Sequence, residues 1–103
     1  MRIYRNQDVL WRDEDDQRKR AFERLSMGEN VEDMGTSILF SDGMMLSLNL
    51  LGTEIWKQCD GKTAEEIISG LLDQFEVDEE VLRQDTMNFL NELSQKGFIR
   101  YEQ

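Results

Sequence analysis

The chain is 103 residues long, 39% hydrophobic and 33% charged, with a formal net charge of −10 at pH 7. This length suits one small domain with one core, and the apolar content is too high for a disordered chain. No apolar run approaches the roughly 20 residues that span a bilayer, and the N-terminus shows no signal peptide. We therefore expect a cytoplasmic protein without a membrane partner.

The residue types present narrow the chemistry. The chain has no histidine and one cysteine, so the commonest general base, the commonest metal ligand and any thiolate cage are missing. Residues 1–26 carry seven basic and six acidic side chains, a net of +1, whereas residues 27–103 carry five basic and sixteen acidic ones, a net of −11. An acidic body repels phosphate backbones, so a basic or amphipathic partner is favoured over nucleic acid.

The N-terminal third is predicted to contain a strand and then a charged helix. The run Val9–Trp11 is β-prone and predicts a first strand. In 13–30 the acidic residues precede the basic ones, as the dipole of a helix prefers, and three apolar residues recur at helical spacing. We expect a charged, helical insertion at 14–34, packed as a solvated helix by its narrow apolar stripe. The alternative is a basic docking arm made of Arg18, Lys19, Arg20 and Arg24.

Residues 36–49 are predicted to form two strands joined by a tight turn. Asp42-Gly43 is a two-residue hairpin signal, because glycine accepts positive φ at little cost. After the turn, Met44, Leu46 and Leu48 alternate with Met45, Ser47 and Asn49, which is the period of a strand. One side should face a core, and the mixed character of the other side favours an open or edge strand.

The rest of the chain is predicted to be helical. Asn49 can cap a first helix that Gly61 closes, and 63-TAEE-66 has the form of a capping box that starts a second. A third helix begins at Asp78 and ends at Lys96-Gly97, followed by a short extended tail that packs Phe98 and Ile99 on the core. Strands followed by helices predict an α+β domain, and the helical half is similar to a helix-turn-helix.

The residues that suggest a reactive or metal site are better explained by structure. Cys59 has no neighbouring cation or base, and Asp60 beside it works against a thiolate, so we expect a buried packing residue. The acidic clusters 13-DEDD-16 and 78-DEE-80 do not have the spacing of a calcium loop and suit helix starts. We expect no enzyme, no metal and no cofactor. The pair Met44-Met45 is either core filler or a pliable surface for apolar peptides.

From Leu48 onward an ordered series of residues resembles the PqqD family. The series is Leu48-Asn49, Ile55-Trp56, Cys59-Asp60-Gly61, Thr63, Glu66-Ile67, Leu71, Phe75, Val81, Asp85, Phe89-Leu90, Leu93 and Gly97-Phe98-Ile99. This family contains the peptide chaperones of pyrroloquinoline quinone biosynthesis, and relatives of these chaperones act as recognition elements in pathways that modify ribosomally made peptides. The resemblance covers residues 46–99, and the helical insertion at 14–34 departs from the family pattern.

The resemblance implies a non-catalytic adaptor comprising residues 1–103, with a three-stranded sheet packed on a winged-helix-like trio of helices. In the family, the leader of a precursor peptide adds as a strand along the third strand, beside the third helix, and a radical SAM maturation enzyme is the expected partner. Carried over, the strand runs from Met44 to Leu48 and the helix from about Asp78 to Lys96. The candidate peptide-binding residues are Met44, Met45, Leu46, Ser47, Leu48, Val81, Gln84, Asp85 and Asn88. For Asp85, a hydrogen bond at the junction of sheet and helix is an equal alternative.

Two other functions compete with this one. A winged-helix DNA-binding regulator would share the three-helix architecture, but the third helix has more acidic than basic residues, which disfavours contact with DNA. A structural subunit without a peptide ligand also fits the sequence. The oligomeric state, the identity of the peptide and its modification are left open by the sequence.

Overall fold

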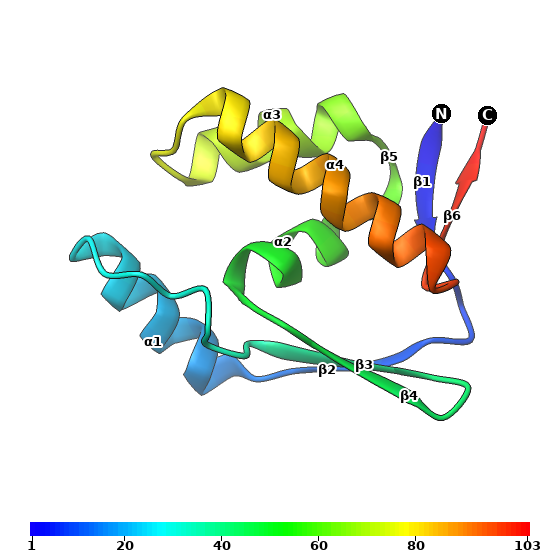
Figure 1. Ribbon diagram of the computed structural model, residues 1–103, viewed down its shortest axis with the longest axis horizontal. Helices are drawn as coiled ribbons and strands as arrows, with labels where there is room; N and C mark the ends of the chain where they lie inside the picture. The colour runs from blue at the N-terminus through cyan, green and yellow to red at the C-terminus, as the bar shows by residue number, and fades with distance from the viewer. The chain divides into compact units, whose positions relative to one another are not determined.

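The computed structural model describes residues 1–103, which form four helices and two three-stranded antiparallel sheets. The sequence predicted one three-stranded sheet, and this is wrong, since the structure has two. None of the four helices has the length and the apolar composition that a membrane span requires. The elements in chain order are β1 (Arg2–Arg5), β2 (Leu10–Asp13), α1 (Asp15–Ser26), β3 (Ser37–Ser41), β4 (Met44–Leu48), α2 (Leu50–Gln58), β5 (Asp60–Thr63), α3 (Ala64–Gln74), α4 (Glu79–Gln95) and β6 (Ile99–Glu102) (Figure 1).

The chain separates into two compact units. The terminal unit comprises Met1–Asn6 and Ile55–Gln103, and the internal unit comprises Gln7–Glu54. Helix α2 belongs to both, since its first five residues lie in the internal unit and the rest in the terminal unit. Asn49 begins this helix as predicted, because its side-chain oxygen accepts a hydrogen bond from the Gly52 amide at 2.9 Å.

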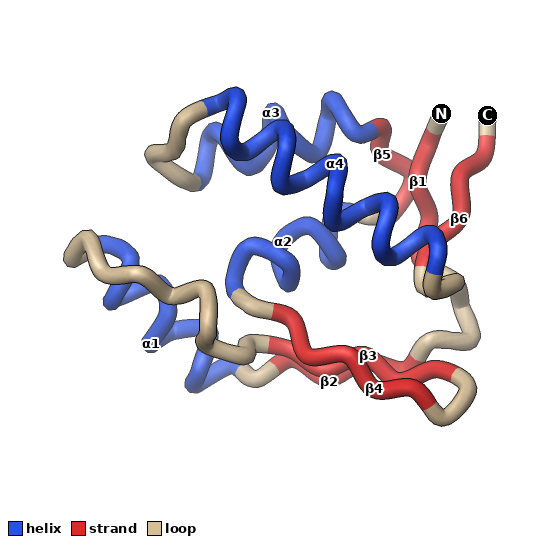
Figure 2. The backbone as a smooth tube through the Cα atoms, in the orientation of Figure 1, coloured by secondary structure: helices blue, strands red, loops and turns tan.

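The terminal unit combines the sheet β5-β1-β6 with helices α3 and α4 (Figure 2). Strand β1 is the middle strand, antiparallel to both neighbours, and Arg2 lies opposite Thr63 on one side and Glu102 on the other. Ile3, at the centre of this sheet, is fully buried. Fully buried side chains from the helices and from the residue just before β6 complete the core: Ile55, Trp56, Ile67, Leu71, Leu90, Leu93 and Phe98.

This sheet overturns the prediction that Cys59-Asp60-Gly61 simply ends a helix. The helix ends at Gln58, and Asp60 begins β5, an edge strand that pairs with β1. Gly61 has a φ of +83° and lies where the β1–β5 register shifts between Ile3 and Tyr4, so the glycine serves a bulge inside the strand. The first strand of the sheet, four residues at the N-terminus, was also missed.

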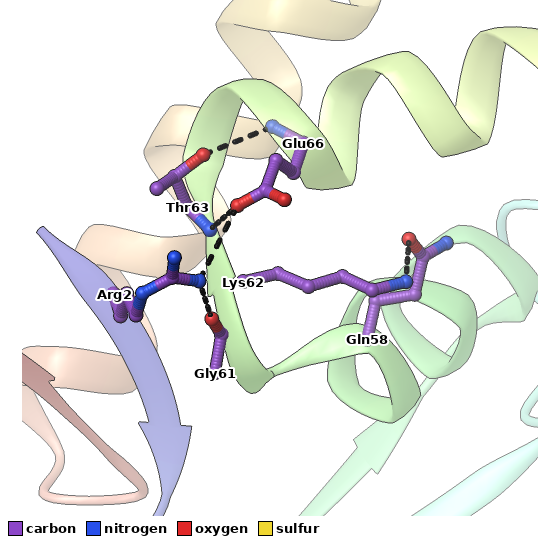
Figure 3. A network of polar contacts seen from close by, with 6 residues as sticks. All are labelled: Arg2, Gln58, Gly61, Lys62, Thr63 and Glu66. Carbon is purple, nitrogen blue, oxygen red and sulfur yellow. Dashed lines mark hydrogen bonds and ion pairs between the residues drawn. The ribbon is translucent and has the colours of Figure 1, made fainter.

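A capping box joins β5 to α3. Thr63 accepts a hydrogen bond from the Glu66 amide at 3.2 Å, and the Glu66 carboxylate accepts one from the Thr63 amide at 3.0 Å (Figure 3). These bonds lower the pKa of Glu66, with a smaller contribution from Arg2, whose guanidinium lies 3.7 Å from the carboxylate. Arg2 also donates to the Gly61 carbonyl at 2.5 Å, so β1, β5 and the start of α3 are linked by one polar network.

The internal unit combines the sheet β2-β3-β4 with α1. Helix α1 lies in the range predicted to be helical, and its Ala21 is fully buried. Arg18 bonds the buried carboxylate of Glu54 through Nε at 3.0 Å and Nη2 at 2.6 Å, and its guanidinium lies 5.3 Å from the centre of the Phe22 ring. Because Arg18 is used in this way, α1 is held on its unit by a paired charge as well as by its apolar stripe.

Hydroxyl groups fix the start of α2 to the internal sheet. Ser37 is the register partner of Leu48, and the Thr36 amide donates a hydrogen bond to the Leu48 carbonyl at 2.7 Å. Both residues therefore lie beside Leu48. Their buried hydroxyls meet the Thr53 hydroxyl at 2.6 and 2.7 Å. The end of β4 is therefore held in a defined place within its unit.

Candidate functional site

Four strands lie at sheet edges, and β4 differs from the other three in charge. The edges are β5 and β6 in the terminal sheet, and β2 and β4 in the internal sheet. Charged side chains on an edge disfavour pairing with a further strand. Strands β5, β6 and β2 each carry two charged residues, and β4, with the sequence MMLSL, carries none: the charged residues are Asp60 and Lys62, Arg100 and Glu102, and Arg12 and Asp13. Strand β4 is the edge whose side chains suit the addition of a strand.

The backbone of β4 offers hydrogen-bonding groups at this edge. The turn residues Asp42 and Gly43 both have positive φ, +50° and +77°, as a two-residue hairpin turn of the primed type requires. The Leu48 carbonyl points at β3, because it accepts the Thr36 amide. In an antiparallel pair the direction of the N–H and C=O groups alternates along the strand, so Met45 and Ser47 direct theirs away from β3.

The side chains of β4 divide into exposed and buried members. Met45 is 66% exposed and Met44 43%, Ser47 is exposed, Leu46 is half-buried, and Leu48 is only 2% exposed. The predicted period of two is confirmed, although Met44 is more exposed than a core residue. The Leu48 side chain belongs to the core, so this member of the predicted set is unsuited to touch a ligand directly.

The helix residues predicted for the site lie on one exposed face of α4. Val81 is 58% exposed, Gln84, Asp85 and Asn88 are also exposed, and the four positions follow helical spacing. Gln84 donates a hydrogen bond to Asn88 at 3.4 Å. Asp85 has no hydrogen-bond partner, so the alternative of a junction hydrogen bond is not seen. The β4 residues belong to the internal unit and the α4 residues to the terminal unit, and each set is gathered on its own element.

The charges of α4 do not suit DNA binding. Arg83 bonds the carboxylates of Glu65 and Glu79, and the first of these bonds is the main reason that its pKa is raised. Lys96 pairs with Glu92 at 2.9 Å. Arg83 in the helix and Lys96 at its C-cap are thus both paired with carboxylates, which disfavours contacts with phosphate groups.

The remaining candidates have structural explanations. Cys59 is fully buried, and burial raises the pKa of its thiol to about 12, only partly offset by the charge of Arg5. A thiol of this kind is neutral at physiological pH and is not a nucleophile. Asp15 and Asp16 lie in the first turn of α1, and Asp78 caps α4 by accepting the Val81 amide at 3.0 Å. No three acidic or cysteine side chains come together as metal ligands.

Comparisons with known proteins agree with the resemblance found in the sequence. The model of the family described as coenzyme PQQ synthesis protein D (PqqD) matches residues 26–99. No curated protein matches the chain significantly in sequence. A solved structure described as TbiB1 in complex with the TbiA(beta) leader peptide has 20% sequence identity, covers 97% of this chain and 99% of its own, and has a TM-score of 0.65. At this identity the likeness establishes a shared fold.

Proposed function

The chain belongs to the PqqD family, and on this premise we propose that it is a non-catalytic adaptor that binds the leader of a ribosomally made precursor peptide. The leader adds as a fourth strand to the internal sheet along β4, and the adaptor presents the peptide to a modifying enzyme. A radical SAM protein is the proposed enzyme. The likeness in fold to a structure solved with a leader peptide supports this assignment.

The observation that carries the proposal is the character of the β4 edge. It is the one edge strand of the four without a charged side chain, and it exposes two methionines. Met45 and Ser47 direct four backbone groups away from β3, which a peptide strand would satisfy. Main-chain hydrogen bonds of this kind provide affinity, and the neighbouring side chains provide selectivity.

The charge of the protein favours a basic peptide or partner. With a net charge of −10, the surface would speed the approach of a leader that carries Lys and Arg, and salt would weaken this effect. The same charge makes a strongly acidic leader an unfavourable ligand. We therefore expect the association rate to fall as ionic strength rises, with a smaller change in the dissociation rate.

The exposed face of α4 is proposed as a second contact surface for the leader. This part of the proposal rests on the family resemblance, with Val81 as the apolar member and Gln84, Asp85 and Asn88 as polar members of the face. Val81→Ser changes a half-exposed side chain without opening the core, so its effect on peptide affinity can be measured separately from any effect of β4 variants.

The test is a titration of isotope-labelled protein with synthetic leader peptides from short reading frames that neighbour the gene. We expect the amide signals of residues 44–48 to shift most, in particular those of Met45 and Ser47, whose N–H groups would gain partners. A scrambled leader of the same composition is the control. If the genuine leaders leave β4 unperturbed, the proposal is wrong.

The enzyme partner needs its own measurement. A tagged form of the protein should retain the product of a neighbouring radical SAM gene, and the leader should still bind within that assembly. Retention of the enzyme without any uptake of leader would instead support a structural subunit.

A further inference from the structure

The outward face of the internal sheet carries a row of large apolar side chains that ends at β4. Leu10 lies opposite Phe40, and Phe40 lies opposite Met45, so the three residues form one row across the three strands. They are 72%, 41% and 66% exposed, respectively. The opposite face of the same strands holds the buried residues, such as Leu39, which is fully buried. The row is therefore an apolar strip on the solvent side of the sheet.

The next row on the same face of the sheet lies two residues further along each strand. It consists of Arg12, Ile38 and Ser47. A Cβ atom added to Gly35 would lie 2.8 Å from the Ser47 hydroxyl oxygen, so only small groups meet at this position. Arg12, at the far end of the row, is bonded to Glu14 through Nε at 3.2 Å and Nη2 at 2.7 Å. Along β4, the outward face is thus large and apolar near the turn and small and polar toward α2.

We infer that the peptide taken up by β4 carries one large apolar side chain opposite Met45, which packs on the outward row formed by Met45 and Phe40. This inference rests on the proposed strand addition. Met45 directs its backbone groups outward, so a peptide residue would lie directly opposite it, with its side chain on the same face as that of Met45. Directly opposed residues have Cβ atoms about 4.5–5.5 Å apart, close enough for an aromatic or aliphatic side chain to cover Met45.

The same geometry predicts tolerance two residues away. The peptide residue opposite Ser47 would lie beside small groups and far from any unpaired charge, so nothing there selects for one residue type. The ligand class is thus an extended segment with a single large apolar anchor and a variable residue two positions from it. A second copy of this protein is a less suitable occupant of the row, because residues 7–54 carry five basic and eleven acidic side chains, a net of −6, and two such surfaces repel.

The test selects ligands from a phage-displayed library of random linear peptides with the full-length protein as bait. Selected peptides that shift the Met45 and Ser47 amides should share a large apolar residue at one position, with no preference two residues away. Replacing this residue by Ser in a synthetic peptide should weaken binding about five- to tenfold, from the apolar area lost. Phe40→Thr and Met45→Thr should each remove most of the difference in affinity between the apolar peptide and its Ser-substituted form.

Leu10→Thr is the matched control. It alters the same row at its far end, about 14 Å from the added strand at the usual spacing between strands, so affinity should change less than twofold. Exposed threonines suit strands, so the three variants should fold, as circular dichroism would check. Peptides that bind β4 without any apolar preference would overturn this inference and leave the proposed function standing. Selected peptides that never perturb β4 would overturn both. A dimer that Leu10→Thr dissociates would show that a second copy covers the row, which also overturns the inference.

Discussion

Both sheets have three strands, but only the internal sheet has an edge strand, β4, without charged side chains. The terminal sheet is assembled from distant segments, and both of its edge strands carry charged side chains. The internal sheet contains a local hairpin, and its β4 edge is uncharged. Edge charges prevent further pairing. Strand content alone does not distinguish the four edges of the two sheets, whereas side-chain charge separates β4, the proposed binding edge, from the other three.

The largest expected effect breaks the terminal sheet while leaving the β4 edge intact. Ile3 is fully buried at the centre of that sheet, so Ile3→Ala should lower the free energy of unfolding by about 2–5 kcal/mol, measured by urea denaturation. At temperatures where the variant stays folded, affinity for the leader should stay within about twofold, which is the variation expected from a site on another element. A loss of affinity in step with stability would show that the two sheets are not functionally distinct.

The next effect breaks the open edge while leaving the fold intact. Met45→Pro removes an N–H group that is directed away from β3, and proline is tolerated on edge strands in this position. We expect leader affinity to fall at least about tenfold, because one main-chain hydrogen bond and the regular pairing of the edge are lost. Leu46→Pro is the contrasting variant, since it removes an N–H group used within the sheet and should lower stability instead. Unchanged leader binding by Met45→Pro would contradict strand addition.

A smaller effect concerns how the stability of the terminal unit depends on pH, a dependence that the β4 edge should not share. Thr63→Ala removes the cap of α3 and should cost about 1 kcal/mol in the free energy of unfolding. Hydrogen bonds from Thr63 lower the pKa of Glu66, so the stabilisation that they provide is present above the ordinary pKa of 4.5 and is lost as pH falls through the lowered value. Thr63→Ala keeps the backbone N–H that makes the first of these bonds and removes the hydroxyl, so only the side-chain part of its cost should fade as pH falls through the lowered pKa. Strand β4 has no ionisable side chain, so its own pairing capacity should not follow this change.

The smallest expected effect comes from removing the charged side chains of β6, which would make this edge strand similar to β4. Arg100 bonds Glu102 on β6, and an exposed pair of this kind contributes little to stability. Replacing both residues by Thr removes the edge charges and should change the unfolding free energy by less than about 1 kcal/mol. It should raise self-association, seen as a concentration-dependent sedimentation coefficient relative to the unaltered protein. An equally monodisperse double variant would mean that charge is not what closes this edge.

Local signals predicted the parts of the fold that depend on neighbouring residues. The Asp42-Gly43 turn, the Thr63 capping box and the helix starts at Asn49 and Asp78 were all predicted correctly, because each depends on contacts within a few residues. The terminal sheet was missed, since Arg2 pairs with Thr63 and with Glu102, and four-residue strands so far apart leave no local signal.

For the candidate site too, the local pattern was predictable from the sequence and the pairing of distant strands was not. The alternation along Met44–Leu48 predicted which side chains are exposed, apart from the extent to which Met44 is open to solvent. Leu48 was included as the last residue of the strand, and its buried side chain agrees with the alternation, which puts it on the core side with Leu46. Leu10 and Phe40 were not considered, since only the register across β2 and β3 brings them into one row with Met45.

The central position of β1 has a consequence for how the chain is made. This strand leaves the ribosome before both of its partners: β5 follows some sixty residues later, and β6 lies at Ile99–Glu102. At a translation rate of about 5–20 residues per second, β1 waits for several seconds with both edges unpaired. The hairpin of β3 and β4 is complete well before that wait ends. During synthesis, the nascent chain would therefore form the hairpin that carries the proposed peptide-binding strand before β1 has paired with either of its partners.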